Sequence, residues 1–218
     1  KPRLLRYLLD RYGETATYLD PDIRLYRPMD WLEELSAGHA AVLTPHTVHP
    51  VPADGRNPSD LYILQSGVYN LGFISVGQKA RPLIDWWWQH LQRHCLVAPD
   101  RNIFVDQRWM DFAPALFDCH ILKDATVNVA YWNLGGRQLA ADGPGYLVNG
   151  EPLTFFHFSG YDPRVPWLLS KHAGAVPRAL LGENPALRRL CDDYAAELFR
   201  AGFEKVAHLR VNQTTLAN

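Results

Sequence analysis

Two carboxylates one residue apart close a short apolar run near the start of the chain. Tyr18 and Leu19 are predicted to end a buried strand, and Asp20-Pro21-Asp22 follows them directly. The strand cannot continue through Pro21, because proline lacks the N–H that a sheet ladder requires. Ligands bind where strands leave an α/β sheet, and paired carboxylates at that edge are suited to a hard divalent cation. The alternative is an ordinary Asp-Pro-Asp turn that caps the next segment.

One histidine late in the chain could complete a site of this kind. His157 lies in the apolar run Phe155–Phe158, and the following Ser159-Gly160 breaks that run. The break predicts that His157 lies at a strand end. A neutral imidazole added to two carboxylates makes a ligand set that suits Mn²⁺. The alternative is a core histidine whose hydrogen bonds are satisfied within the protein.

Three further places carry polar groups that could face a ligand. Asp106-Gln107 opens a predicted helix, either as an N-cap pair or as a polar pair aimed into a cleft. Asn70 precedes Gly72 in an apolar strand, and the glycine is predicted to let another group approach the backbone. Arg164 lies in a stiff, proline-containing loop, as a solvated residue or as a diphosphate contact. Further histidines without paired ligand spacing are predicted to be surface or core residues: His46, His49, His90, His94, His120 and His172.

Composition indicates the class of protein. The 218 residues are 47% hydrophobic and include 7 Trp, 10 Tyr and 9 Phe, which predicts a folded globular chain. A formal net charge of −1 gives no electrostatic signal for a nucleic-acid partner or an anionic membrane. The three cysteines form neither a metal-ligand pattern nor a disulfide framework. No apolar run is long enough for a transmembrane segment. A cytoplasmic protein is predicted, and a peripheral position at the inner membrane face is equally compatible.

Alternating strand and helix patterns predict the α/β class. Helical periodicity with capping signals occurs at residues 2–12, 28–38, 79–94, 106–117 and 185–201. Short apolar runs predict strands at residues 17–20, 40–44, 61–64, 69–76, 121–122, 127–129 and 153–158. Residues 47–60 and 135–150 are predicted to be mostly loop. The loop-rich second half indicates that the sheet becomes mixed there, within a single domain.

In their order along the chain, the polar motifs resemble the GT-A glycosyltransferases, and most closely the glycogenin and lipopolysaccharide galactosyltransferase group. That group carries a D-x-D, an asparagine before a glycine, an Asp-Gln pair and a late His-Phe-x-Gly in this order. The matching stretches here are Tyr18–Ile23, Tyr69–Phe73, Phe104–Gln107, Asn128 and His157–Gly160. The ordered set is far more specific than any one of its members.

The resemblance implies a GT-A-like fold, which is a Rossmann-like mixed sheet flanked by helices. It predicts one GT-A-like domain over residues 1–218, with a catalytic core at about 1–167 and a C-terminal helical part at about 168–218. Members of the group carry about a hundred residues before the D-x-D, which form the nucleotide-binding half of the domain. This chain has only the helix at residues 2–10 in that place. A partial domain, cut from a longer protein, is therefore expected.

The function implied by the resemblance is metal-dependent sugar transfer. The donor would be a nucleotide sugar and the acceptor a hydroxyl group, in glycan or polysaccharide assembly. Asp20 and Asp22 would approach a divalent metal, Mn²⁺ or Mg²⁺, and the nucleotide ribose. His157 would be the third protein ligand of that metal.

The resemblance also assigns the remaining site residues. Asp106 and Gln107 would be the catalytic pair. If the reaction inverts, Asp106 would deprotonate the acceptor, with Asp111 behind it; if it retains, as the likeness favours, the pair would position and stabilise the donor sugar. The donor-binding residues would be Asp20, Asn70, Gly72, Gly160 and Arg164. Arg164 stands where the group has the lysine of a Lys-Pro-Trp, and arginine is not equivalent to lysine at a phosphate.

Two other function classes remain open from the residues alone. One is a non-catalytic sugar- or nucleotide-binding module, including an inactive fragment of such an enzyme. The other is a metal-dependent hydrolase that uses the same Asp/Asp/His cluster. The products released from a nucleotide sugar distinguish the three, because only a transferase passes the sugar to an acceptor and releases a nucleoside diphosphate.

Overall fold

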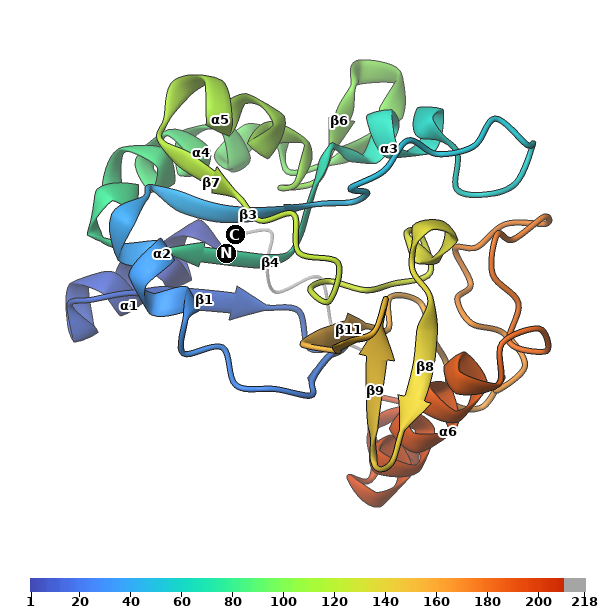
Figure 1. Cartoon of the computed structure of the whole chain (residues 1–218). Coiled ribbons are helices and arrows are strands. Elements are labelled where there is room, and N and C mark those ends of the chain that lie inside the picture. Colours follow the sequence, from blue (N-terminus) through green and yellow to red (C-terminus); the bar gives the residue numbers. More distant parts are fainter. Residues whose placement is uncertain (210–218) are drawn as a thin grey trace.

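The computed structural model describes residues 1–209 and has a mixed α/β fold built around one mixed sheet. Four strands form this sheet in the order β1-β4-β3-β7. Their bounds are Ala16–Leu19 (β1), Ala41–Pro45 (β3), Tyr69–Val76 (β4) and Cys119–Ile121 (β7). Strand β4 is antiparallel to β1 and β3, whereas β3 and β7 are parallel (Figure 1). The predicted α/β class with a mixed sheet is therefore confirmed.

Helices cover both faces of the four-stranded sheet. Helices α1 (Pro2–Tyr12) and α4 (Arg81–His94) pack against one face, and α2 (Leu32–Gly38) packs against the other. Successive side chains of a strand point to opposite faces. In β3, Leu43 joins the cluster with α1 and α4, and Val42 joins the cluster with α2. Because both faces are buried, polar side chains that serve a ligand must lie at the ends of the strands.

The strongest helix signals in the sequence are confirmed. Helix α1 ends at Gly13, whose left-handed φ of 89° closes the last turn through a bond to Leu9 O. A short 3₁₀ turn, η1 (Gln78–Ala80), leads into α4. Helix α6 (Pro185–Arg200) begins at Asn184, whose side chain accepts a hydrogen bond from the backbone of the first turn. Helices α1 and α6 combine an apolar face with a local cap, and α4 combines an apolar face with a proline in its first turn, so the sequence alone is sufficient to place them.

The predicted strand at residues 61–64 is wrong, because these residues belong to helix α3 (Asp60–Ser66). Ser59 caps this helix, with its Oγ accepting a hydrogen bond 3.4 Å long from Tyr62 N. Within the run only Ile63 is buried, while Leu61 and Leu64 face outward. The Ser-Asp start signal outweighs the apolar run that suggested a strand.

The predicted helix at residues 106–117 is also wrong in its form. Asp106 and Gln107 precede it as a turn, and the helical part is a 3₁₀ segment, η3 (Arg108–Phe112), followed by the short α5 (Ala113–Leu116). Pro114 removes one hydrogen-bond donor inside the segment. Gln107 thus precedes a 3₁₀ segment without capping it through its side chain, which makes tertiary contacts instead.

A second layer follows the sheet in sequence and includes a strand hairpin. Strands β8 (Leu139–Asp142), β9 (Gly145–Val148) and β10 (Glu151–Pro152) form an antiparallel sheet against which α6 packs (Figure 1). The prediction of a loop over residues 135–150 is thus wrong. Tyr146 and Val148 alternate inward, and the tight turn before Gly145 joins the two strands. The two inward side chains of β9 make an alternating pattern that is too short to distinguish a strand from a loop.

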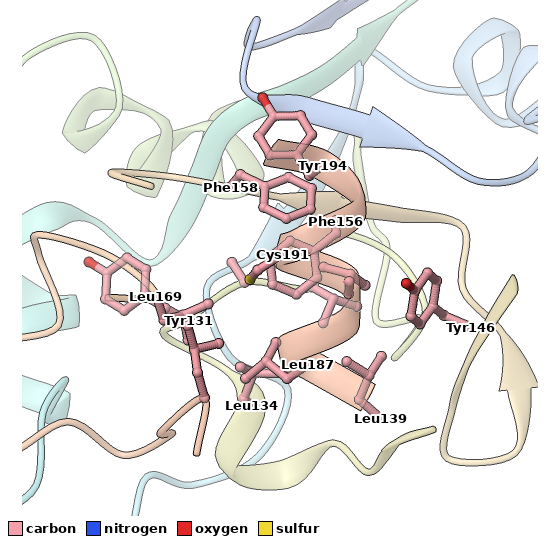
Figure 2. Close-up of a cluster of buried hydrophobic side chains, with 14 of the residues drawn as sticks. Tyr131, Leu134, Leu139, Tyr146, Phe156, Phe158, Leu169, Leu187, Cys191 and Tyr194 are labelled. Carbon is pink, nitrogen blue, oxygen red and sulfur yellow. The ribbon is translucent and has the colours of Figure 1, made fainter. Parts of the chain in front are cut away.

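The core of this layer is rich in aromatic side chains. Figure 2 shows Leu187, Cys191 and Tyr194 of α6 facing Phe156 and Phe158. The rings of Phe158 and Tyr194 stack with centroids 3.8 Å apart. The stacking of Phe158 on Tyr194 anchors the chain next to His157 to helix α6.

Short strand pairs connect distant parts of the chain. Strand β11 (Phe155–His157) pairs antiparallel with β2 (Ile23–Leu25), and β5 (Val97–Ala98) pairs with β6 (Ile103–Phe104). The predicted strand at residues 127–129 is reduced to one isolated bridge between Val129 and the middle of β11. The β11–β2 pair matters most, because it sets His157 opposite Ile23 and next to the two carboxylates.

Three short 3₁₀ or α segments complete the described elements: η2 (Pro99–Arg101), η4 (Leu134–Gly136) and α7 (Phe203–Val206). The predicted C-terminal helical part contains α6 and α7, and its residues 210–218 lie outside the described residues. Among residues 1–209, every helix is too short or too polar to cross a membrane.

Candidate functional site

Asp20, Asp22 and His157 come together as a compact group of possible metal ligands. One ligand atom from each lies within 4.8 Å of the others. His157 Nε2 is 3.1 Å from Asp22 Oδ1 and 4.0 Å from Asp20 Oδ2. Asp20 leaves the sheet directly after β1, and its N–H donates to Gly72 O over 2.7 Å. The sequence prediction that these three residues share one place therefore agrees with their geometry.

One atom of this cluster in particular fits a cation. Asp22 Oδ1 is buried, and its one close polar neighbour is His157 Nε2 at 3.1 Å, which is not a hydrogen bond of good geometry. Burial acts to raise the pKa of the Asp22 carboxyl, but the His157 imidazole and the local backbone together hold that pKa below its ordinary value. Asp22 is therefore ionised and an acceptor. Two carboxylates and one imidazole around a common point match the donor set that Mn²⁺ accepts.

Gly72 allows the imidazole of the candidate metal ligand His157 to approach strand β4. A Cβ at this position would clash with His157 Cε1, and it would lie 2.7 Å from His157 Nδ1 and 2.8 Å from Asn70 Oδ1. His157 itself is only 4% exposed. The prediction that Gly72 leaves room for another group is confirmed, and that group is His157.

Gly72→Ala is expected to weaken the affinity for Mn²⁺ by about 10- to 100-fold, the usual effect of disturbing the support of a metal-ligating histidine. The added methyl group pushes the His157 ring away from Asp22. Mn²⁺ titration of the purified variant, followed by calorimetry, measures the change. Gly38→Ala is the matched control, because a Cβ at Gly38 meets no atom within 4 Å. Equal Mn²⁺ affinity in both variants would remove His157 from the ligand set.

Gln107 is the central connector of the site. Its Oε1 accepts hydrogen bonds from Leu71 N at 2.9 Å and from Asn70 Nδ2 at 3.4 Å, and its Nε2 donates to Ser66 O at 2.9 Å. These bonds join β4, α3 and the turn before η3. Asn70 Oδ1 accepts from Gly72 N at 3.1 Å. The two amides are therefore held rigidly in the wall of the site.

Lys1 is a site residue that the sequence analysis missed. Its Nζ lies 3.0 Å from Asp106 Oδ2 and 3.7 Å from Asp20 Oδ1, and it donates to Leu71 O at 2.9 Å. The side chain is 17% exposed. The Lys1 ammonium group thus lies between the Asp20 and Asp106 carboxylates. A single lysine at the start of a helix carries no motif, so only the tertiary contact identifies it.

Backbone strain is located beside Asp106. Val105 has a φ of 41°, a left-handed conformation that is unfavourable for a β-branched residue. Its N–H donates to Leu96 O at 2.8 Å, and the Trp87 indole donates to Asp106 O at 3.0 Å. Such strain persists where neighbouring contacts enforce it, and it is frequent at functional sites. These contacts fix the direction in which Asp106 enters the site.

A network of buried polar side chains lies behind the site. Asn128 donates to Thr44 Oγ1 at 3.0 Å and to Asn70 Oδ1 at 3.2 Å. Asn133 donates to the carbonyl oxygens of His46 and Asn128, both at 3.0 Å. Burial lowers the pKa of His46 to about 4, so its imidazole is neutral near pH 7. The prediction that His46 is a core or surface residue agrees with its burial, and its place in the cleft lining had no signal in the sequence, because a lone histidine after a strand has no distinguishing spacing.

These groups surround one cleft of about 280 Å³, close to the lower end of the roughly 300–1,000 Å³ of small-molecule sites. The structure gathers most of the predicted site residues in its lining: Asp20, Asp22, Asn70, Gly72, Asp106, Gln107 and His157. Tyr62, Tyr131 and Trp132 add aromatic surface that the sequence analysis did not single out. The cleft therefore combines a carboxylate–imidazole cluster, a lysine, fixed amides and aromatic rings.

Two predicted donor-binding residues are not in this lining. The Arg164 guanidinium forms two hydrogen bonds, at 2.9 and 2.6 Å, with the carboxylate of Asp162, and it lies over the Phe203 ring. Gly160 packs against the side chains of Ser170 and His172. His172 is exposed, as the prediction of a surface or core residue allows, and it also lines the cleft.

Asp111, the predicted second carboxylate behind Asp106, stabilises the local fold. It pairs with Arg108, and its Oδ1 accepts a hydrogen bond from Val68 N at 2.8 Å. It does not line the cleft. Asp111 therefore joins η3 to the start of β4, and Asp106 is the carboxylate that faces the site.

The chain is similar to two proteins of Bacillus subtilis (strain 168). It is 30% identical over 168 residues to the uncharacterized protein YfnF, covering 74% of this chain and 55% of YfnF. It is also 30% identical over 168 residues to the uncharacterized protein YfnD, covering 52% of that relative. The chain thus spans about half the length of these curated relatives. No family model matches the chain, and neither does any solved structure.

Proposed function

We propose that this chain carries the catalytic centre of a metal-dependent glycosyltransferase of GT-A type. The enzyme moves a sugar from a nucleotide-sugar donor to a hydroxyl acceptor in glycan or polysaccharide assembly. One observation supports this above the others: Asp20, Asp22 and His157 form a possible metal cluster on the wall of the cleft that also contains Asp106 and Gln107. A hydrolase cluster alone does not require fixed amides and aromatic rings in the same cleft.

The metal-side residues of the proposal are Asp20, Asp22 and His157, which would hold Mn²⁺ or Mg²⁺. When bound, the cation supplies Lewis-acid stabilisation for the negative charge on a departing diphosphate. Lys1 places a second positive charge beside Asp20. Electrostatic stabilisation of this kind is effective because the groups are already oriented before the reaction begins.

The sugar-side residues of the proposal are Asp106, Gln107 and Asn70. The Asp106 carboxylate would face the positive charge that develops at the anomeric carbon, and it pairs with Lys1 at 3.0 Å. The Gln107 and Asn70 amides hold the neighbouring backbone in place, so that donor and acceptor meet in a fixed orientation. Tyr62, Tyr131 and Trp132 offer ring surfaces on which a sugar acceptor can lie.

The proposal includes a cytoplasmic location, with a peripheral position at the inner membrane face for an acceptor held in the membrane. The free state of the three cysteines suits a reducing compartment. Since the chain spans about half the length of its relatives, the nucleotide base is proposed to be bound by other parts of the full protein.

A donor panel tests the proposal. The full protein is incubated with uridine, guanosine, adenosine, cytidine and thymidine diphosphate sugars, with Mn²⁺ and then with a chelator, and nucleoside diphosphate release is measured. Release that depends on Mn²⁺ and increases with added hydroxyl acceptors is expected. Mn²⁺ binding without release of any product would favour the non-catalytic module. Free phosphate without nucleoside diphosphate would favour the hydrolase.

A further inference from the structure

The segment around His172 is clamped to the chain that follows the candidate metal ligand His157. Ser170 Oγ donates to Ser159 O at 2.7 Å and accepts from His172 N at 3.1 Å. Lys171 N donates to Gly160 O at 3.0 Å. Ser170 is only 1% exposed, so this clamp is an internal part of the fold. The position of His172 is therefore tied to the strand end that carries His157.

Gly160 makes the close approach of His172 possible. Its φ of 72° is left-handed, and a Cβ there would lie 2.5 Å from His172 Cδ2, 2.7 Å from Ser170 Oγ and 3.1 Å from His172 Nε2. The imidazole edge thus lies directly on the glycine backbone. This contact explains the glycine of the His-Phe-Ser-Gly motif by packing, and it gives the imidazole one orientation at the rim of the cleft.

His172 lies on the Asp22 side of the cleft. Phe158 N donates to Asp22 O at 2.8 Å, the nearby Gly160 packs against His172, and both Asp22 and His172 line the cleft. Lys1, which also lines the cleft, forms a salt bridge with Asp106. Arg164 is turned to Asp162 and away from the cleft. His172 is thus a nitrogen donor of the cleft lining that can meet an anion near Asp22.

We infer that His172 binds the diphosphate of the donor, in the place that the sequence resemblance assigned to Arg164. Its ring N–H would donate a hydrogen bond to a phosphate oxygen beside the cation held by Asp20, Asp22 and His157. A neutral imidazole is a sufficient donor, so the contact does not require a protonated histidine. The inference rests on the proposed function and names the residue that recognises the leaving group.

Binding of inorganic pyrophosphate tests this assignment without turnover. Calorimetry with the full protein measures first the affinity for Mn²⁺ alone and then the affinity for pyrophosphate in saturating Mn²⁺. His172→Ala is expected to leave Mn²⁺ affinity within about 2-fold and to weaken pyrophosphate by about 10-fold or more, the value of one hydrogen bond to a charged group. His172→Gln keeps an N–H donor and is expected to recover part of the loss.

Comparison variants decide between the rival assignments. Arg164→Ala probes the residue that the sequence favoured, and His39→Gln is a matched control outside the cleft, where His39 pairs with Asp118. A pyrophosphate loss in Arg164→Ala but not in His172→Ala would overturn the inference. An equal loss of Mn²⁺ and pyrophosphate affinity in His172→Ala would overturn it too, because His172 would then act on the metal ligands.

The pyrophosphate experiment and the donor panel can fail independently of each other. If wild-type protein transfers no sugar from any donor but His172→Ala still loses pyrophosphate, the proposed function fails and the anion contact stands. If wild-type protein transfers sugar and His172→Ala binds pyrophosphate normally, the function stands and the inference fails.

Discussion

Asp22→Ala is expected to abolish metal-dependent sugar transfer, with a fall of at least about 1,000-fold in turnover, because the cation loses a carboxylate ligand and with it several kcal/mol of charge stabilisation. The fold should remain. The Asp22 side chain is 40% exposed and contributes to none of the buried hydrophobic clusters. We expect its removal to change the free energy of unfolding by less than about 1 kcal/mol, as for other partly exposed pairs.

Initial rates in a Mn²⁺ series, together with thermal unfolding, separate the two effects of Asp22→Ala. Asp192→Ala is the matched control: Asp192 is half exposed on α6 and pairs with Arg188. The control should retain wild-type rates and wild-type Mn²⁺ affinity. Full activity in Asp22→Ala would show that the carboxylate pair is only a turn, which is the alternative that the sequence left open.

Asp106→Asn is expected to lower turnover by about 100- to 1,000-fold, the usual effect of removing one oriented charge from a reaction centre. Asparagine keeps the size of the side chain but loses the negative charge. The backbone there is fixed independently, by the Trp87 indole on Asp106 O and by the Val105 bond to Leu96 O. The loss is therefore expected in kcat, with the donor KM nearly unchanged.

A secondary result is expected from the Lys1 contact. Lys1 Nζ is shared between Asp106 at 3.0 Å and Asp20 at 3.7 Å. In Asp106→Asn it has Asp20 as its remaining carboxylate partner, so the affinity for Mn²⁺ should fall modestly. Asp100→Asn, exposed in the η2 turn, is the control and should change neither quantity. Unchanged kcat in Asp106→Asn would exclude the residue from catalysis.

The anomeric configuration of the product identifies what Asp106 does. Proton NMR of the first product formed distinguishes inversion from retention. An inverted product would mean that Asp106 deprotonates the acceptor, and its loss should then be partly restored at higher pH by hydroxide. A retained product would mean that Asp106 stabilises the donor sugar, and higher pH should then have little effect.

Local patterns carried much of the fold. Helices α1, α4 and α6 were predictable because each has an apolar face and a signal at or beside its end, such as Gly13 after α1 or Asn184 before α6. Strand β4 was predictable as one long apolar run. Elements with short or conflicting signals were not. Residues 61–64 were predicted as a strand and the β8–β9 hairpin as a loop, because each segment has too few residues for its hydrophobic period to be recognised.

The sequence by itself determined which groups are available: a strand that stops at Asp20 and Asp22, a histidine at the end of an apolar run, and a glycine where the backbone must be approached. These are short-range facts, since Pro21 ends a ladder and Gly72 lacks a side chain wherever the chain folds. Only the tertiary structure decided which groups meet. The pairing of β11 with β2 sets His157 against Asp22, and Lys1 reaches Asp106 across β4. It also paired Arg164 with Asp162 outside the cleft and placed the exposed His172 at the cleft rim against Gly160, because side-chain conformation and loop packing are not encoded by spacing along the chain.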